Sequence, residues 1–108
     1  MRIIYTKSYE KTLKNIKKYK QEKELLNEIL EYIKRQPTFT KMIRDPLIAI
    51  YHFERLKYEL NEFYSFRLSK VIRLIVKPKD NDIEIDLVYI SKDHYNDFNK
   101  GKVICYDE

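Results

Sequence analysis

Residues 63–90, FYSFRLSKVIRLIVKPKDNDIEIDLVYI, decide the fold. Apolar side chains recur at every second position in the segments 63–68, 71–77 and 83–90. This is the pattern of strands that bury one face. Short polar stretches separate the segments and are typical of turns. We therefore expect three consecutive antiparallel strands.

The connections between these strands set the expected register. Directly opposed residues of two strands share a face, so the first hairpin requires a connection with an odd number of residues, most simply Ser69-Lys70-Val71. A two-residue turn, Asp80-Asn81, fits the second hairpin. The expected pairs are Phe66 with Leu74, Arg67 with Arg73, Lys77 with Glu84, and Val76 with Ile85. In the third strand we expect strict alternation, with Ile83, Ile85, Leu87 and Tyr89 on one face and Glu84, Asp86 and Val88 on the other.

Two amphipathic helices are predicted upstream. Residues 2–5 are β-like, and Thr6 or Ser8 is suited to cap the helix that follows. That first helix carries a stripe of lysines on the side opposite its apolar residues. The stripe includes Lys11, Lys14 and Lys18. Apolar residues in 25–33 predict a second helix that ends before Pro37. Residues 38–50 are compatible with a helical turn or an edge strand.

Together these elements predict one α+β domain over residues 1–108. An N-terminal helical hairpin packs on the apolar face of a small, mostly antiparallel sheet, and Arg67 and Arg73 lie side by side on the uncovered face. Opposed like charges are mildly destabilising, so their adjacency suggests an anionic partner such as phosphate. The alternative is two solvated arginines on a wet face.

The composition is that of a folded domain. It is 44% hydrophobic and 36% charged, with one glycine. Cys105 is the only cysteine, so no intramolecular disulfide forms, and no metal-ligand spacing is present. There is no secretory signal and no apolar run long enough for a bilayer, so we expect a cytoplasmic protein with no membrane partner.

Positive charge is concentrated in the first part of the chain. Residues 1–36 hold 10 Lys and Arg against 5 Asp and Glu, and residues 37–79 hold 9 against 4. Residues 80–108 hold 3 against 8. A basic body suits contact with a nucleic-acid backbone, although a solvated lysine-rich surface explains the charge equally well.

Four blocks of sequence carry a resemblance to a known family. They are Phe53-Glu54-Arg55-Leu56-Lys57, Leu60-Asn61-Glu62-Phe63-Tyr64-Ser65-Phe66-Arg67, Ile72-Arg73-Leu74-Ile75-Val76 and Asp93-His94-Tyr95. In order and spacing they resemble the RelE/ParE superfamily of type II toxins, and within it the YoeB/Txe-like ribosome-dependent mRNA endoribonucleases. The order of strand, two helices and three strands also matches over most of the chain.

The resemblance implies a metal-independent endoribonuclease that needs no cofactor. Its catalytic positions fall on Glu54, Arg73, His94 and Tyr95, and basic positions beside the site fall on Lys57 and Arg67. Glu54 is expected to be the general base for a ribose 2′-hydroxyl, and His94 the acid for the departing 5′-oxygen. The arginines stabilise the phosphate charge, Tyr95 stacks on or orients a base, and the lysine stripe meets ribosomal RNA.

The sequence departs from the family in three places. Residues 96–108 form an acidic extension after the His-Tyr pair, which often ends the chain in the family. Asn61-Glu62 stands where the family usually has a glycine turn, and residues 38–51 have no clear counterpart. The departures leave every proposed catalytic group in place.

The implied partners are an inhibitory antitoxin, mRNA and the 70S ribosome, with operator DNA reached only through the antitoxin and a homodimer left open. Two other functions remain: a ParE-like inhibitor of gyrase, and a non-catalytic antitoxin-binding module. Individual residues also have plain readings. Glu54 pairs with Arg55 or Lys57 on a surface, His94 is a loop histidine, His52 is structural, and Cys105 is a passive thiol.

Overall fold

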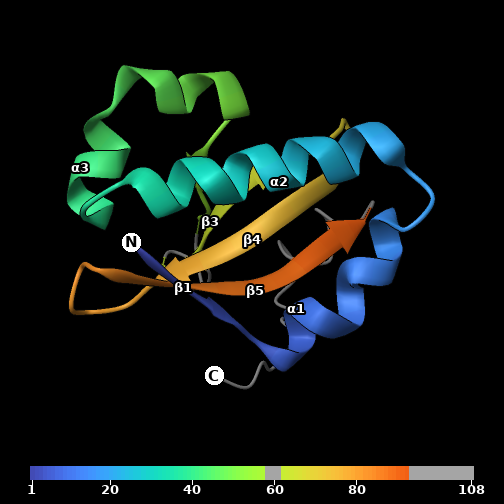
Figure 1. The fold of residues 1–108 in the computed structure, drawn as a ribbon, viewed down its shortest axis with the longest axis horizontal. Helices are drawn as coiled ribbons and strands as arrows, with labels where there is room; N and C mark the ends of the chain where they lie inside the picture. The colour runs from blue at the N-terminus through green and yellow to red at the C-terminus, as the bar shows by residue number, and fades with distance from the viewer. Residues whose placement is uncertain (58–61, 93–108) are drawn as a thin grey trace.

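The structure, a computed structural model, describes residues 1–57 and 62–92 and has the predicted α+β architecture (Figure 1). Its elements in chain order are β1 (Arg2–Tyr5), α1 (Lys7–Thr12), the 3-10 helix η1 (Leu13–Ile16), α2 (Lys20–Arg35), α3 (Phe39–Arg44), the 3-10 helix η2 (Pro46–Tyr51), β2 (Glu54–Arg55), β3 (Tyr64–Arg67), β4 (Ile72–Pro78) and β5 (Glu84–Lys92). No helix in the described part is long and apolar enough to cross a membrane.

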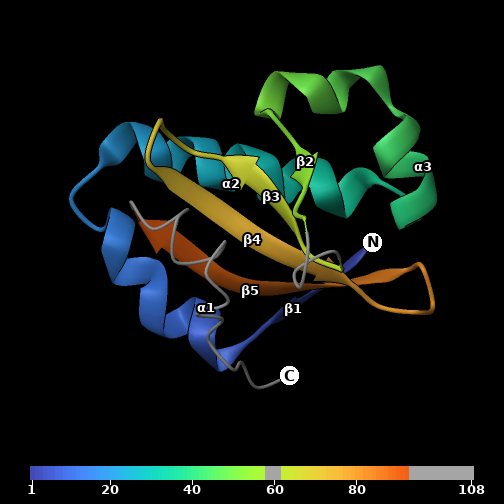
Figure 2. The same cartoon turned by 180° about the vertical axis from the view of Figure 1, so that it is seen from behind.

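The strands form one sheet in the order β1-β5-β4-β3-β2. The first strand pairs with β5 in parallel, and all other neighbours are antiparallel, as the mostly antiparallel prediction requires. Figure 1 shows α2 lying across one face of the sheet, and Figure 2 looks onto the opposite face. The large hydrophobic core lies between α2 and the sheet.

The first hairpin has the predicted register. Phe66 pairs with Leu74, and Arg67 pairs with Arg73. The Ser69 hydroxyl accepts hydrogen bonds from the backbone N–H groups of Val71 at 3.2 Å and Ile72 at 3.1 Å. This side chain closes the predicted three-residue connection, because serine can satisfy the turn's backbone donors itself.

The second hairpin is longer than predicted. Val76 pairs with Leu87, and Lys77 with Asp86, so the expected two-residue turn and its pairs with Ile85 and Glu84 are wrong. The reason is local turn chemistry. The Asn81 side-chain oxygen accepts hydrogen bonds from the N–H groups of Ile83 and Glu84, both at 3.1 Å, and Asp82 adopts a left-handed φ of 66°.

The strict alternation predicted for β5 is wrong, because the strand contains a β-bulge. The register shifts between Ile75, which pairs with Tyr89, and Val76, which pairs with Leu87. Val88 is the extra residue, and it joins Tyr89 in one buried cluster, whereas Ile90 lies in the main core. Tyr89 is therefore not on the face of Ile85 and Leu87. Strict alternation fails because a bulge moves all later side chains by one position.

The N-terminal helices begin and end close to the predicted points. The Thr6 hydroxyl caps α1 by accepting from the Tyr9 N–H at 3.1 Å, and α2 ends at Arg35, before Pro37. The segment 7–16 is α-helical only as far as Thr12 and continues as η1. Side chains from both α1 and α2 contribute to the main core.

The first helix also covers the part of β5 that extends beyond β1. The Thr6 hydroxyl donates to the carbonyl oxygens of Leu87 at 2.7 Å and Val88 at 3.0 Å. The Ile90 N–H donates to the Thr12 hydroxyl at 2.8 Å, and Asn15 Nδ2 donates to the Ile90 carbonyl at 2.8 Å. Side chains thus satisfy backbone groups that would otherwise need another strand.

Residues 38–51 take the helical alternative. Thr38 caps α3 by accepting from the Lys41 N–H at 3.1 Å, and Asp45 caps η2 by accepting from the Leu47 N–H at 3.1 Å. Pro46 then occupies the first position of η2, where its missing N–H is harmless. His52 ends η2 in a left-handed conformation with φ of 50°.

Candidate functional site

Aromatic packing fixes the strand that begins with Glu54. The ring of the preceding residue, Phe53, stacks on Tyr64 with 5.2 Å between centroids and lies 4.8 Å from Phe66. These contacts belong to the main core. Successive side chains of a strand point to opposite faces, so anchoring Phe53 in the core places Glu54 on the other face of the sheet.

The structure brings Glu54, Arg67 and Arg73 together on that other face. Glu54 Oε1 lies 3.8 Å from Arg73 Nε, and Arg67 is directly opposed to Arg73. The three residues belong to β2, β3 and β4, which are neighbours in the sheet. This is the cluster predicted from the sequence, with a carboxylate beside two guanidinium groups.

The ion pair between Glu54 and Arg73 crosses over β3. Strands are about 4.8 Å apart, so residues on β2 and β4 are separated by roughly 10 Å at their backbones. Contact at 3.8 Å therefore requires both side chains to lean towards each other above β3. The side chain of Arg73 is 16% exposed and that of Glu54 is 45% exposed, so the carboxylate remains open to solvent.

The prediction that this face is uncovered is wrong. Leu56, Ile75, Val88 and Tyr89 form a second, smaller buried cluster on it, with Phe63 packed alongside. Arg67 is half-buried, and its Nε has no hydrogen-bond partner in the described part of the chain. The face is therefore partly apolar, and the reading of two freely solvated arginines does not fit.

Ser65 is a member of the site that the sequence argument did not single out. It is directly opposed to Glu54 on one side and to Ile75 on the other, and only 1% of it is exposed. Its hydroxyl oxygen is buried and has no hydrogen-bond partner among residues 1–57 and 62–92. The alternation of 63–68 places Ser65 on the face of Arg67, but the sequence does not reveal its pairing with Glu54.

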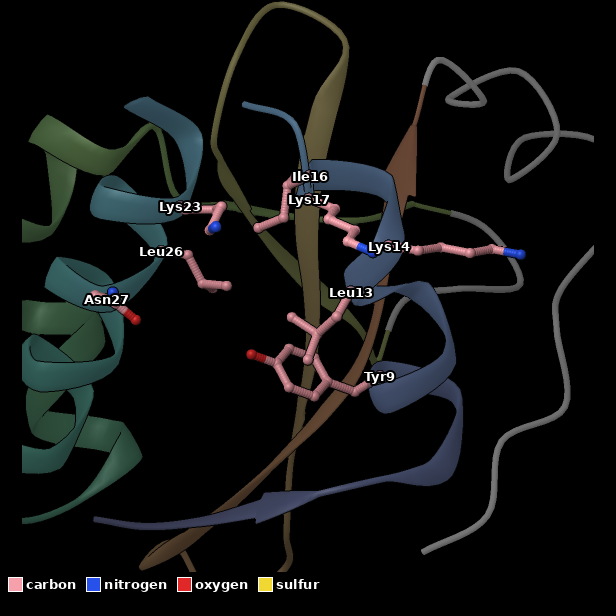
Figure 3. Close-up of a pocket in the computed structure, with 8 residues that line it drawn as sticks. All are labelled: Tyr9, Leu13, Lys14, Ile16, Lys17, Lys23, Leu26 and Asn27. Carbon is pink, nitrogen blue, oxygen red and sulfur yellow. The ribbon is translucent and has the colours of Figure 1, made fainter. Parts of the chain in front are cut away.

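The predicted RNA-contacting lysines lie elsewhere or at the margin. Lys57 is exposed just after β2. Lys11, Lys14 and Lys18 are exposed, and Lys14 borders a pocket of about 490 Å³ between α1, η1 and α2 (Figure 3). The residues lining that pocket are Tyr9, Leu13, Lys14, Ile16, Lys17, Lys23, Leu26 and Asn27, so it contains none of the Glu54 cluster.

Tyr9 forms an apolar wall of this pocket, and Figure 3 shows its hydroxyl pointing into the space towards α2. Burial raises the pKa of Tyr9 from 10.0 to about 12, with smaller contributions from Tyr5 and Glu10. Its protonated form is therefore favoured in the folded chain, which makes it a poor proton donor near neutral pH.

Two further ion pairs lie near the second hairpin. Lys79 Nζ is 3.3 Å from the fully buried carboxylate of Asp86, and Lys77 Nζ is 3.7 Å from Glu62. The Lys77 ammonium also lies 5.7 Å from the centre of the Phe63 ring. These contacts hold the charged end of β4 in place.

Several predicted site residues cannot be placed. His94, Tyr95, Cys105 and the extension at 96–108 lie outside the described residues, as does Asn61 of the predicted Asn61-Glu62 turn. Among the residues that the structure describes, no three His, Cys, Asp or Glu side chains are grouped as metal ligands.

Comparison with known proteins rests on structure, since no family model and no curated protein matches the sequence. A YoeB/ParE toxin from Agrobacterium tumefaciens is similar over 85% of this chain and 98% of its own, with a TM-score of 0.63 and 16% identity. YafQ from E. coli is similar over 87% and 96% of the two chains, with a TM-score of 0.63 and 19% identity.

This chain has the RelE/ParE toxin fold. The YoeB dimer from Staphylococcus aureus is also similar, over 88% of this chain and 98% of that one, with a TM-score of 0.62 and 24% identity. In the RelE/ParE fold of the present chain, Glu54, Arg67 and Arg73 occupy adjacent strands of the sheet. The fold resemblance inferred from the sequence is thus confirmed.

Proposed function

We propose that this protein is the toxin of a type II toxin–antitoxin pair and acts in the cytoplasm as a ribosome-dependent mRNA endoribonuclease. The observation that carries the proposal is the contact of Glu54 with Arg73, beside Arg67, on the sheet face away from α2. A half-exposed carboxylate next to two guanidiniums suits proton removal beside a bound phosphate.

In the proposed reaction, Glu54 removes the proton from the 2′-hydroxyl of an mRNA nucleotide. The 2′-oxygen attacks the adjacent phosphorus, and the bond to the 5′-oxygen of the next nucleotide breaks. Arg73, helped by Arg67, stabilises the negative charge that grows on the phosphate oxygens. Arg73 contacts Glu54 in the free chain, so a phosphate that binds this guanidinium arrives next to the proposed base.

The remaining roles follow from the resemblance of the sequence to the YoeB/Txe-like nucleases. His94 protonates the departing 5′-oxygen, and Tyr95 stacks on or orients a base. The chemistry needs no metal or other cofactor. Lys57 contacts the RNA backbone beside the site, and Lys11, Lys14 and Lys18 add salt-dependent contact with ribosomal RNA.

The proposed inhibitor is an antitoxin with an acidic segment that neutralises Arg67 and Arg73. A DinJ–YafQ complex from E. coli is among the similar structures, with a TM-score of 0.60 and 17% identity, which supports a protein partner of this kind. Operator DNA is reached only through the antitoxin. The YoeB dimer supports testing for a homodimer as well.

Primer-extension mapping of cellular mRNA tests the proposal. The chain and its Glu54→Ala and His94→Ala variants are induced briefly, with and without an inhibitor of translation. We expect new 5′ ends within translated regions for the parent, and none for either variant or when translation is blocked. Growth arrest without new ends would contradict the proposal and favour a gyrase inhibitor or a binding module, as would variants that cut like the parent.

A further inference from the structure

The Ser65 hydroxyl is a buried polar group without a partner in the described structure. Native proteins pair most buried polar groups, because an unpaired one destabilises the folded state. Ser65 is 1% exposed and its Oγ accepts and donates no hydrogen bond among the described residues. An alanine would avoid this cost in the same strand, so the hydroxyl calls for an explanation outside stability.

Ser65 lies directly across from Glu54. Opposed residues in antiparallel strands have Cβ atoms about 4.5–5.5 Å apart, so a serine hydroxyl reaches a glutamate carboxylate that turns towards it. The Glu54 side chain also leans across β3 to reach Arg73, which brings it above the segment that holds Ser65 and Arg67. Ser65 therefore lies beside the Glu54 side chain where that side chain crosses β3.

In the free chain the Glu54 carboxylate accepts no hydrogen bond from the described residues. Its contact with Arg73 Nε, at 3.8 Å, is longer than a hydrogen bond. A phosphate that binds Arg73 competes directly for this contact. Glu54 would then lose its contact with the Arg73 guanidinium at the step in which its carboxylate has to be held near the 2′-hydroxyl.

We propose that Ser65 is a positioning residue that holds Glu54 in the substrate complex. When phosphate engages Arg73, the Ser65 hydroxyl donates a hydrogen bond to the Glu54 carboxylate and fixes its orientation towards the ribose. This inference rests on the proposed function. It explains why the hydroxyl has no hydrogen-bond partner among the described residues of the free chain, since catalytic hydrogen bonds often form only in the substrate complex.

The test measures single-turnover cleavage of mRNA on purified ribosomes at saturating and at half-saturating concentrations of the chain. For Ser65→Ala we expect the saturating rate to fall roughly 10- to 100-fold, with the half-saturating concentration unchanged, because only orientation of the base is lost. Ser65→Thr keeps the hydroxyl and should restore most of the rate.

Two further readouts separate positioning from a structural role. Removing an unsatisfied hydroxyl should leave the Tm of the chain unchanged or raise it, whereas a structural serine would lower it on replacement. In a Glu54→Gln background, Ser65→Ala should cause no further loss of rate, because the two residues act as one unit. This double-mutant cycle of Glu54→Gln and Ser65→Ala does not depend on whether Ser65→Thr folds.

The outcomes distinguish this inference from the function on which it rests. A slow Glu54→Gln variant together with a Ser65→Ala variant that cleaves like the parent would overturn the positioning role and leave the nuclease proposal standing. Equal losses on replacing Ser65 in both backgrounds would also overturn it. A Glu54→Gln variant that cleaves at the parental rate would overturn both.

Discussion

The two faces of the sheet use the same strands in different ways. The face under α2 is filled with large apolar side chains such as Phe66, Leu74 and Ile90, all of which are fully buried. The opposite face combines the small cluster of Leu56, Ile75, Val88 and Tyr89 with the charged group at Glu54. Its buried atoms Ser65 Oγ and Arg67 Nε have no hydrogen-bond partner among residues 1–57 and 62–92.

This difference indicates a division of labour between the faces. The side chains of the main core on the α2 face are buried, and burial of apolar surface is the main favourable term in folding. Polar atoms such as Ser65 Oγ and Arg67 Nε weaken the other face. Variants on the α2 face should therefore mainly lower stability, and variants at the Glu54 cluster should mainly lower activity.

Replacing Glu54 by Gln should give the largest effect, and on activity alone. A positioned base contributes about 10²–10⁴-fold, so cleavage of ribosome-bound mRNA should slow by that factor. The free energy of unfolding, measured in urea, should change by less than about 1 kcal/mol, because half-exposed ion pairs contribute little. Glu62→Gln removes the carboxylate that faces Lys77 and should cleave like the parent. Comparable loss in both variants would mean that Glu54 has no special role.

Replacing Phe66 by Ala should give the largest effect on stability. This ring is fully buried and contacts Phe53 and Tyr51, and loss of such a side chain costs about 3–5 kcal/mol. Urea unfolding measures the change. Val71→Ala, at a position that is 46% exposed, is the control and should stay within about 0.5 kcal/mol. A small effect of Phe66→Ala would remove the distinction between the faces.

Alkaline pH should lower the free energy of unfolding through Tyr9, a buried residue of the main core. The pKa of Tyr9 is about 12 in the folded chain and 10.0 ordinarily, so folding favours the protonated form. Its contribution is complete below pH 10 and is lost as the pH rises towards 12, by about 1–3 kcal/mol in total. Urea unfolding at pH 9, 10, 11 and 12 measures the loss. Tyr9→Phe should reduce the slope over this range, whereas Tyr19→Phe, at an exposed ring, should keep it. Identical slopes in all three proteins would rule out this role for Tyr9.

The lysines of the first helix should give the smallest effect, seen only in the salt dependence of binding. Replacing Lys14 by Gln removes at most one phosphate contact. The slope of log affinity for ribosomes against log salt should then become shallower by about 0.7–0.9. Lys34→Gln, at a lysine that pairs with Glu31 on α2, should keep the parental slope. A slope that is the same in both variants would place ribosomal contact away from Lys14, which lies in η1.

The parts of the fold that were predicted are those set by local rules. The pairing of Arg67 with Arg73 follows from alternation and an odd connection, and the Thr6 cap follows from the hydroxyl before an amphipathic segment. The second hairpin was not predictable in this way. The Asp82 carbonyl accepts from the Phe39 N–H at 2.8 Å, and its side chain accepts from Thr40, so a distant helix helps to fix that turn.

The site was predicted in its charges but not in its surroundings. Alternation along the strands placed Arg67 beside Arg73, and the resemblance to the YoeB/Txe-like family selected Glu54. The burial of their face depends on the bulge at Val88, which turns Tyr89 towards it, and a bulge leaves no mark in the alternation. Ser65 was missed because the role proposed for it rests on a buried hydroxyl without a partner in the described part of the chain, and burial of this kind is seen only in the folded structure.

The covering of β5 by α1 has a consequence for how this protein behaves when its N-terminus is altered. Thr6 and Asn15 donate three hydrogen bonds to β5 and Thr12 accepts one, so these side chains satisfy the strand where β1 no longer does. Without residues 1–16, β5 would still pair with β4, but its other edge would be open along Glu84–Lys92, and an open strand edge is a template for pairing with other chains and for aggregation. The first helix therefore protects solubility as well as completing the core.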